Sequence, residues 1–199
     1  MRRILYTAVA LTIVMTVLTG LAYPLVITGI AQGLFHHQAN GSLVSGPNGQ
    51  IVGSELIGQS FDDAAGNPLP QWFQPRPSAA GSGYDAMSSG ASNLGPTNPA
   101  LISAVQSALT AYRSFNHLPA STPVPVDAVT SSASGLDPEI SIANARLQAP
   151  RVAAARGVPL ATVQQLIDKA TVGRVWDVMG EPGVNVLDLN LSLARLGSR

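Results

Sequence analysis

Few side chains in this 199-residue chain have the type and spacing that catalysis or metal binding requires. The histidines are His36, His37 and His117, and no third ligand is spaced to complete a metal site with the adjacent pair. Serine is abundant, but no G-x-S-x-G turn occurs, and the only lysine, Lys169, is not part of an S-x-x-K motif. These patterns argue against a hydrolase whose nucleophile is activated by a neighbouring base.

Two short segments resemble motifs that handle ATP, and neither is complete. Asp168–Thr171 reads DKAT, which lacks the glycine of the phosphorylated D-K-T-G motif and falls at the end of an amphipathic helix pattern. Ser88–Ser92 reads SSGAS, a run expected by chance in a chain rich in serine and glycine. Since no G-x-x-x-x-G-K-[ST] loop is present, we expect no cofactor to be bound by this chain alone and no ATP hydrolysis by it.

Charged residues are few and balanced. Lys plus Arg and Asp plus Glu are 11 each, and the basic residues form no run, so nucleic acid is not an expected partner. Asp62-Asp63, Asp137, Glu139 and Glu181 lie beside glycine or proline, where turns and caps are the default interpretation. The absence of cysteine excludes disulfides, a thiol nucleophile and cysteine metal sites.

The element that organises the chain is its apolar beginning. After Arg2 and Arg3 no charged residue appears until Glu55, and Ile4–Ile30 is apolar almost throughout. As a helix these 27 residues extend ~40 Å, more than the ~30 Å hydrocarbon core of a bilayer. We interpret the run as an uncleaved membrane helix. The alternative is a signal peptide cleaved near Ala22, but the run continues past that residue and exceeds the usual apolar region of such peptides.

Four residues of this run have predicted roles at the membrane. Tyr6 and Tyr23 are placed as interfacial anchors near its two ends. Gly20 offers a small face for contact with another helix, and Pro24 predicts a bend or the outer membrane boundary. Because the arginine pair precedes the span, we expect the N-terminus in the cytoplasm and the remainder outside.

The chain therefore divides into three predicted segments. Residues 1–31 form the transmembrane helix, residues 32–53 a polar linker with a turn at Pro47-Asn48-Gly49, and residues 54–199 one periplasmic or extracellular domain. No repeat is visible. The fold class that we expect is α+β, with one N-terminal membrane helix and a single loop-rich exported domain.

Local signals predict most elements of that domain. Asn98-Pro99 opens the clearest helix, because a capping residue precedes proline at the first helical position, and the stretch before it, 74–99, reads as one long irregular segment. The remaining expectations are short strands within 51–61 and over 125–130, a turn or a helix that Asp137-Pro138 caps and that runs to about Gln148 before Pro150 interrupts it, a helical piece over 151–156, a helix over 159–171, and a helix rather than a strand over 184–196.

Several motifs together resemble one known family. They are Gly53–Phe61, Trp72–Ala79, Tyr84-Asp85, Ser89–Pro99 (SGASNLGPTNP), Pro125–Asp127, Ser134–Pro138, Arg151–Ala153, Ala155–Gly157, Gly180–Pro182 and Val184–Leu187. With the membrane helix and its Tyr23-Pro24, this pattern closely resembles the C subunit of the Kdp potassium-transporting ATPase over essentially the whole chain. Two positions depart from it: Glu139 stands where we expect histidine, and Gly183 where we expect arginine.

The resemblance implies a non-catalytic subunit of a bacterial inner-membrane potassium pump, with its main domain on the periplasmic side. Its implied partners are the potassium-selecting A subunit, the P-type ATPase B subunit, the small F subunit and membrane lipid. ATP and potassium would be used by the complex. The family implies a role in assembly and a role as a catalytic chaperone that raises the ATP affinity of the B subunit. The alternative function is a stand-alone, membrane-tethered exported enzyme or binding protein.

The long loop is the candidate functional region. It is polar, lacks catalytic groups and is longer than most loops of compact domains, which favours a contact surface for a partner. An equally open interpretation is structural, since turn and cap chemistry explains its residues. The candidate residues are Tyr84, Asp85, Ser89, Asn93, Gly95, Thr97 and Asn98.

Overall fold

A computed structural model describes residues 1–46 and 48–196 of the chain, so Pro47 of the predicted turn lies outside the described residues. The chain divides into two compact units, Met1–Leu43 and Val44–Arg199. The regular elements of the first unit are helices, except that a strand begins at its last residue, Leu43. The second unit is a mixed α+β domain, as expected from the sequence.

The N-terminal unit is built on one continuous helix, Arg2–Leu34, that is long and apolar enough to cross a membrane. It consists of α1 (Arg2–Val17), a π-helical turn (Leu18–Ala22) and α2 (Tyr23–Leu34), and a short α3 (His36–Ala39) follows. Its side chains are exposed, as suits a lipid-facing helix.

Polar groups within this helix are satisfied locally. The hydroxyls of Thr7, Thr12 and Thr19 each donate to the carbonyl four residues before, at 2.7–3.0 Å. Pro24 cannot donate a backbone hydrogen bond, and the π-helical turn directly precedes it. The chain therefore accommodates Pro24 by widening one turn, and the helix continues past it.

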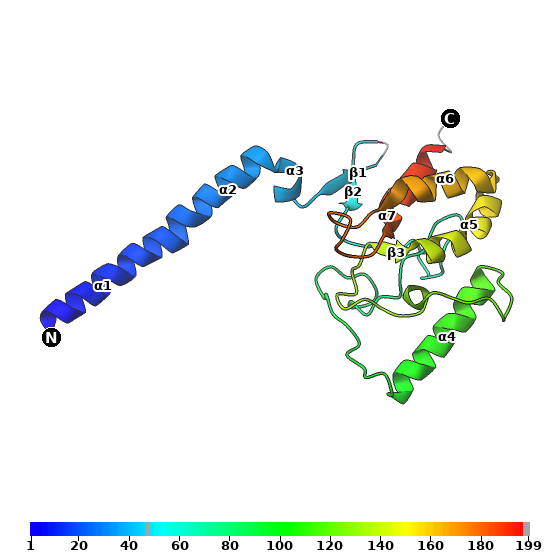
Figure 1. The fold of residues 1–199 in the computed structure, drawn as a ribbon, viewed down its shortest axis with the longest axis horizontal. Coiled ribbons are helices and arrows are strands. Elements are labelled where there is room, and N and C mark those ends of the chain that lie inside the picture. Colours follow the sequence, from blue (N-terminus) through cyan, green and yellow to red (C-terminus); the bar gives the residue numbers. More distant parts are fainter. Residues whose placement is uncertain (47, 197–199) are drawn as a thin grey trace. The chain divides into compact units, whose positions relative to one another are not determined.

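The domain core lies between a small sheet and three helices (Figure 1). The antiparallel sheet has the order β3-β5-β4, formed by Glu139–Ser141, Gly183–Asn185 and Thr171–Val172. Ile140 and Thr171 both pair with the central Val184. The helices are α5 (Ile142–Arg156), α6 (Leu160–Ala170) and α7 (Val186–Leu196). Their inward faces bury Phe73, Ala149, Val152, Val163, Ile167, Leu189 and Leu193.

The rest of the domain is largely irregular. A two-stranded sheet pairs β1 (Leu43–Ser45) with β2 (Ile51–Ser54), and no helix or regular strand follows until α4 (Pro99–Phe115). The predicted cap of α4 is confirmed, because Asn98 Oδ1 accepts from the Ala100 N–H at 2.9 Å. None of the side chains of α4 is fully buried, and the last turns of the helix contact α5: the Tyr112 hydroxyl donates to Asn144 Oδ1 at 2.8 Å, and the Phe115 ring lies against the Arg151 guanidinium.

Two predicted elements are wrong. Val126–Ala128, within the expected strand 125–130, is a 3-10 turn. The Asp127 carboxylate accepts from the Ser141 N–H and hydroxyl, both at 2.8 Å, and so attaches this turn to the end of β3. Of the two alternatives at Asp137-Pro138, the turn is confirmed, because Asp137 Oδ1 accepts from the Glu139 N–H at 3.0 Å, and the helix is wrong. Helix α5 starts at Ile142 instead, since Glu139–Ser141 pair as β3 and the Ser141 hydroxyl accepts from the Asn144 N–H.

Pro150 does not interrupt the helix, contrary to expectation, and α5 is continuous from Ile142 to Arg156. Proline frees the carbonyl of residue 146, and because both positions face solvent, water can satisfy that group. The expected helix at the C-terminal end is confirmed from Val186 on. Asn185 Oδ1 caps it by accepting from the Asp188 N–H, while residues 183–185 pair as β5.

Candidate functional site

Side chains hold the irregular segment 70–76 in place. They supply the hydrogen bonds to its backbone that a neighbouring strand supplies in a sheet. The amide of Asn190 on α7 pairs with both backbone groups of Phe73, accepting from its N–H and donating to its C=O at 2.9 Å each. The amide of Gln148 on α5 does the same for Gln74, at 2.8 and 2.9 Å. Two extended residues thus have all four backbone groups satisfied by buried amides.

Two arginines on α5 complete this attachment. The buried Arg151 guanidinium donates to the carbonyls of Pro70 and Trp72 and lies 4.2 Å from the centre of the Phe115 ring. Burial lowers the pKa of Arg151 to about 10. Arg156 donates to the Gln71 carbonyl at 2.7 Å and stacks over the Trp72 ring. The helical core therefore fixes the start of the loop region.

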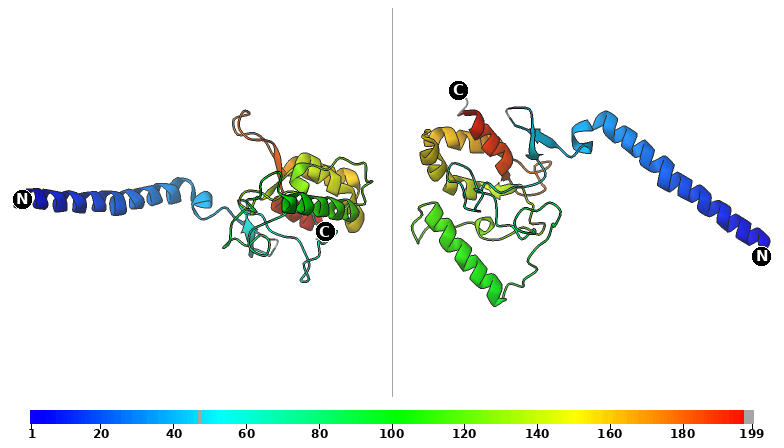
Figure 2. Two further views of the ribbon diagram at one scale, coloured as in Figure 1. Left: turned by 90° about the horizontal axis from the view of Figure 1, so that it is seen from below. Right: turned by 180° about the vertical axis from the view of Figure 1, so that it is seen from behind.

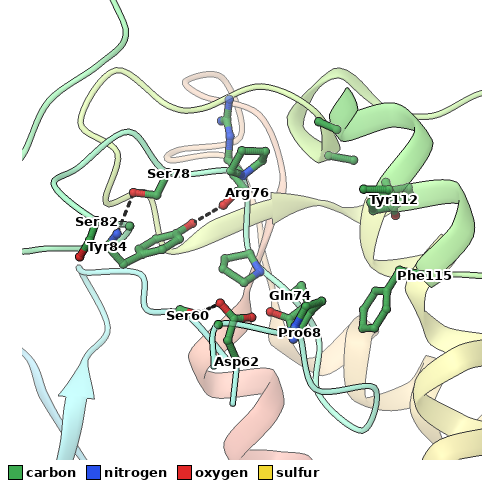
Figure 3. Close-up of a pocket in the computed structure, with 17 residues that line it drawn as sticks. Ser60, Asp62, Pro68, Gln74, Arg76, Ser78, Ser82, Tyr84, Tyr112 and Phe115 are labelled. Carbon is green, nitrogen blue, oxygen red and sulfur yellow. Dashed lines mark hydrogen bonds between the residues drawn. The ribbon is translucent and has the colours of Figure 1, made fainter. Parts of the chain in front are cut away.

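The Tyr84 turn is fixed by a second set of contacts, shown in Figure 3. The Tyr84 hydroxyl donates to the Arg76 carbonyl and its N–H donates to Ser78 Oγ, both at 2.8 Å. Ser78 Oγ in turn donates to the Gly135 carbonyl at 2.7 Å. Burial, followed by the charge of Asp137, raises the pKa of Tyr84 well above its usual value. The phenol is therefore a neutral structural donor.

An ion pair connects this turn to the segment before β3. Arg76 Nη1 lies 3.0 Å from Asp137 Oδ2, and the Arg76 guanidinium also reaches the carbonyls of Thr130 and Ser131. The side chains of the pair are 23% and 30% exposed, so the pair is partly screened by solvent. It holds the Arg76 side chain against the segment before β3.

The first half of the candidate loop is attached to the segment 132–135. Asp85 Oδ1 accepts from the Met87 N–H at 2.9 Å and closes a local turn. The Ser89 hydroxyl and the Gly90 N–H both donate to the Ser134 carbonyl, at 3.0 and 2.9 Å. Gly135 adopts a φ of +69°, and a Cβ there would lie 2.7 Å from Ala80 N and 2.8 Å from the Gly90 carbonyl. The close approach requires glycine.

The second half of the loop is exposed. Within the described chain, the backbone N–H groups of residues 91–97, among which Pro96 has none, have no hydrogen-bond acceptor, and the next N–H, that of Asn98, donates to the Gly95 carbonyl. Asn93 has a φ of +53° and is exposed, as are Gly95 and Thr97. The seven candidate residues thus fall into two sets: Tyr84, Asp85, Ser89 and Asn98 shape the loop, whereas Asn93, Gly95 and Thr97 present it to solvent.

A pocket of about 390 Å³ opens beside the Tyr84 turn, between the irregular segment and α4. Its lining is mixed: Pro68, Pro75, Tyr84 and Phe115 supply apolar surface, and polar side chains such as Ser60, Gln74, Arg76 and Ser78 lie among them (Figure 3). Its exposed carboxylate, Asp62, accepts from the Ser60 hydroxyl. Among the described residues no group of three His, Asp or Glu side chains could hold a metal ion. The pocket therefore suits an apolar segment better than a reacting substrate.

The two departures from the expected sequence pattern lie in contact. Glu139 on β3 and Gly183 on β5 are diagonal neighbours in the sheet, and a Cβ at position 183 would lie 2.7 Å from Glu139 Oε2. The Glu139 side chain thus occupies the space above Gly183. Burial, followed by the charge of Asp137, raises the pKa of Glu139. Sequence reasoning marked both positions, but only the fold shows that they form one pair.

A helix that is long and apolar enough to cross a membrane, followed by one folded α+β domain, is the architecture of a membrane-anchored protein. A model of the KdpC family, described as the c chain of K⁺-transporting ATPase, matches residues 5–195. The chain belongs to this family and is a subunit of a potassium-transporting ATPase complex.

Relatives match over almost the full length. The potassium-transporting ATPase KdpC subunit of Mycobacterium tuberculosis H37Rv is 54% identical over 196 residues, which cover 98% of this chain and 100% of the relative. The KdpC subunit of Acidobacterium capsulatum is 53% identical over 192 residues, covering 96% and 98%. That of Caulobacter sp. K31 is 53% identical over 178 residues, covering 89% and 86%.

Proposed function

We propose that this chain is a non-catalytic accessory subunit that supports assembly of the potassium pump, and that residues 91–97 of its long loop contact a partner subunit. The observation that carries the proposal is the contrast along the loop. Its start is attached to the domain through Tyr84 and Ser89, whereas the backbone N–H groups of 91–97 have no acceptor within the described chain. An exposed loop whose start is fixed to the domain, and whose donors have no partner within the described chain, is suited to bind another protein.

The pocket beside the Tyr84 turn is a second proposed contact site. Its proline and aromatic side chains offer apolar area, and the Asp62 carboxylate offers one acceptor. An apolar segment of a partner subunit could enter it. We infer no chemical step at this site.

The proposed topology follows the sequence. Residues 1–31 cross the bacterial inner membrane with the N-terminus in the cytoplasm. Residues 32–53 connect this helix to the domain over 54–199, which lies on the periplasmic side. The proposed partners are the potassium-selecting A subunit, the P-type ATPase B subunit and the small F subunit. ATP and potassium are used by the complex, and none is bound by this chain alone.

A chaperone effect on ATP affinity is proposed as indirect. ATP is bound on the cytoplasmic side, whereas the proposed topology places the domain outside, so the domain would act through the membrane helices of its partners. The helix face with Tyr6, Gly20, Tyr23 and Pro24 is the proposed route, since the π-helical turn at Leu18–Ala22 places Gly20 next to a local widening of the helix.

Co-purification tests the loop contact. The double variant Asn93→Ala/Thr97→Ala removes two exposed polar side chains without touching the hydrogen bonds that hold the loop. With an affinity tag on this chain, we expect detergent-solubilised wild-type protein to carry the other pump subunits and the variant to carry at least fivefold less. The control is Gln164→Ala/Gln165→Ala, on the exposed face of α6. Unchanged recovery and unchanged potassium uptake in the loop variant would overturn the contact proposal.

A further inference from the structure

The connection between β4 and β5 forms an apolar arm that projects from the domain (Figure 2, left). Its tip, Arg174–Glu181, exposes Val175, Trp176, Val178 and Met179 by 58%, 81%, 75% and 51%. A soluble surface normally scatters large apolar residues singly. Four of them within five consecutive positions mark an interaction surface.

The arm is preorganised by its own bonds. Val175 and Met179 exchange two backbone hydrogen bonds, at 2.9 and 3.0 Å. At its base one nitrogen of the Arg174 guanidinium lies 2.8 Å from each carboxylate oxygen of Glu181. The apolar side chains are therefore presented on a closed turn, and little conformational entropy remains to be lost when a partner covers them.

The turn also holds two residues in an uncommon backbone conformation. Trp176 and Asp177 both have positive φ, of +53° and +61°. This conformation is disfavoured for residues with a Cβ, and a tryptophan in it that is 81% exposed gains no burial in the domain. The observed geometry is thus explained better by a role in contact than by a role in folding.

The charges around the tip decide between a lipid surface and a protein as the occupant. Proteins that insert into anionic bilayers combine apolar side chains with unpaired lysine or arginine. Here Arg174 is already paired with Glu181, the only lysine of the chain, Lys169, lies on α6, and the residue at the apex is the acidic Asp177. A carboxylate between Trp176 and Val178 is suited to a protein recess with a donor at its base.

We propose that the Arg174–Glu181 arm docks into an apolar recess of another polypeptide of the same pump, one that offers backbone N–H groups or a cation to Asp177. This inference rests on the proposed function as an assembly subunit. Tryptophan is enriched among binding hot spots, and methionine is enriched at protein interfaces. The buried area is small, but partners anchored in one membrane meet at high effective concentration, so a small anchor adds usefully to the contact.

Site-specific photo-crosslinking in the assembled pump tests the arm. A photoreactive amino acid replaces Trp176 in the full chain, the complete pump is expressed, and the complex is isolated through a tag on this chain after irradiation. Mass spectrometry identifies what is attached. We expect attachment to one other pump polypeptide. The same probe at Gln164, on the exposed face of α6, should give at least tenfold less of it.

The remaining outcomes separate the two proposals. If the other pump polypeptides are recovered but the probe at position 176 attaches only to lipid, only to a second copy of this chain, or to nothing, the inference is overturned while the assembly role stands. If the unmodified chain recovers no pump polypeptide, the assembly role fails and the inference fails with it. A second variant, Trp176→Ala/Val178→Ala, should lower recovery of the attached polypeptide at least threefold, because it keeps the hydrogen bonds of the turn and removes its apolar area.

Discussion

The side-chain amide of Asn190 makes the two backbone hydrogen bonds to Phe73 that a neighbouring β-strand would otherwise make. Asn190 Oδ1 accepts from the Phe73 N–H and Asn190 Nδ2 donates to the Phe73 carbonyl, both at 2.9 Å, across 117 positions of sequence. Phe73 is fully buried, so its backbone groups have no access to water. The irregular segment therefore enters the core only because α7 supplies this amide.

Replacing Asn190 with leucine should destabilise the domain strongly. The change keeps a similar volume but leaves two buried backbone groups of Phe73 without partners, at about 1–3 kcal/mol each. The free energy of unfolding should thus fall by about 2–6 kcal/mol. Denaturant titration of the detergent-solubilised chain, followed by tryptophan fluorescence, measures it, because Trp72 adjoins this segment. The control Gln106→Leu, on the exposed face of α4, should change stability by less than about 0.5 kcal/mol. Equal effects of the two changes would contradict this account of Phe73.

Two glycine substitutions should give opposite results. At Gly135 the φ is +69°, and a new Cβ would meet the backbone of Ala80 and Gly90, which cannot move aside cheaply. We expect Gly135→Ala to cost about 2 kcal/mol or more and to expose the loop to protease. At Gly95 nothing lies within 4 Å of the added atom, so Gly95→Ala should leave stability unchanged. Limited proteolysis with mass spectrometry of the fragments compares them, and equal cleavage of the two variants would refute the close contact at Gly135.

Replacing Arg151 with lysine should destabilise the domain, although the positive charge is kept. The guanidinium donates to Gln148 and Asn116 as well as to two carbonyls, and an ammonium group cannot make all these bonds in the same geometry. We expect Arg151→Lys to lower the midpoint of thermal unfolding by several degrees, in line with a loss of about 2 kcal/mol. The exposed Arg146→Lys is the matched control on the same helix. A midpoint within one degree of the wild type would show that charge alone suffices at this position.

The charge of Glu139 should destabilise the domain at neutral pH. Burial and then Asp137 raise the pKa of this carboxyl above its ordinary value of 4.5, so the folded state holds the proton more tightly than the unfolded state. Stability contributed by this group therefore falls as pH rises from the unfolded-state pKa through the folded-state pKa. Glu139→Gln, which removes the charge and keeps the shape, should be more stable than the wild type at pH 7.

The gain from Glu139→Gln should shrink as pH falls through the folded-state pKa, because the wild-type carboxyl is then neutral too. Thermal unfolding at a series of pH values from 7 to 4 measures the difference. Glu181→Gln serves as the control, since its carboxylate is exposed and paired with Arg174, and it should show no gain at pH 7. A gain in stability that is independent of pH would contradict this account, because it would mean that the shape of the side chain at position 139, and not its charge, causes the difference.

Elements with local signals could be predicted from the sequence. The capping residue and proline at Asn98-Pro99 predicted the start of α4, and the apolar run predicted the long N-terminal helix. Both signals depend on neighbouring residues alone. The contacts that place the loop could not be predicted. Asn190 lies 117 positions from Phe73 and Gln148 lies 74 from Gln74, and an amide on a helix carries no mark of a distant backbone partner.

The errors have the same origin. The apolar pattern of Val126–Ala128 suggested a strand, but Asp127 is held by Ser141 and Asn144 from elsewhere in the chain. The apolar residues of the β4–β5 arm could equally have formed a buried strand, and only the fold shows Trp176 exposed. Local patterns thus predicted most helices, although not the start of α5 or its continuity through Pro150, while long-range polar contacts decide how the first half of the loop is held.

Hydrogen–deuterium exchange of residues 91–97 tests the central claim most directly. In the isolated full-length chain these amides lack acceptors and should exchange within seconds, whereas amides in the centre of α5 should stay protected. In the assembled pump, the account predicts that 91–97 becomes at least tenfold slower while α5 is unchanged. Exchange of 91–97 at the same rate in the isolated chain and in the pump would contradict a contact at this loop.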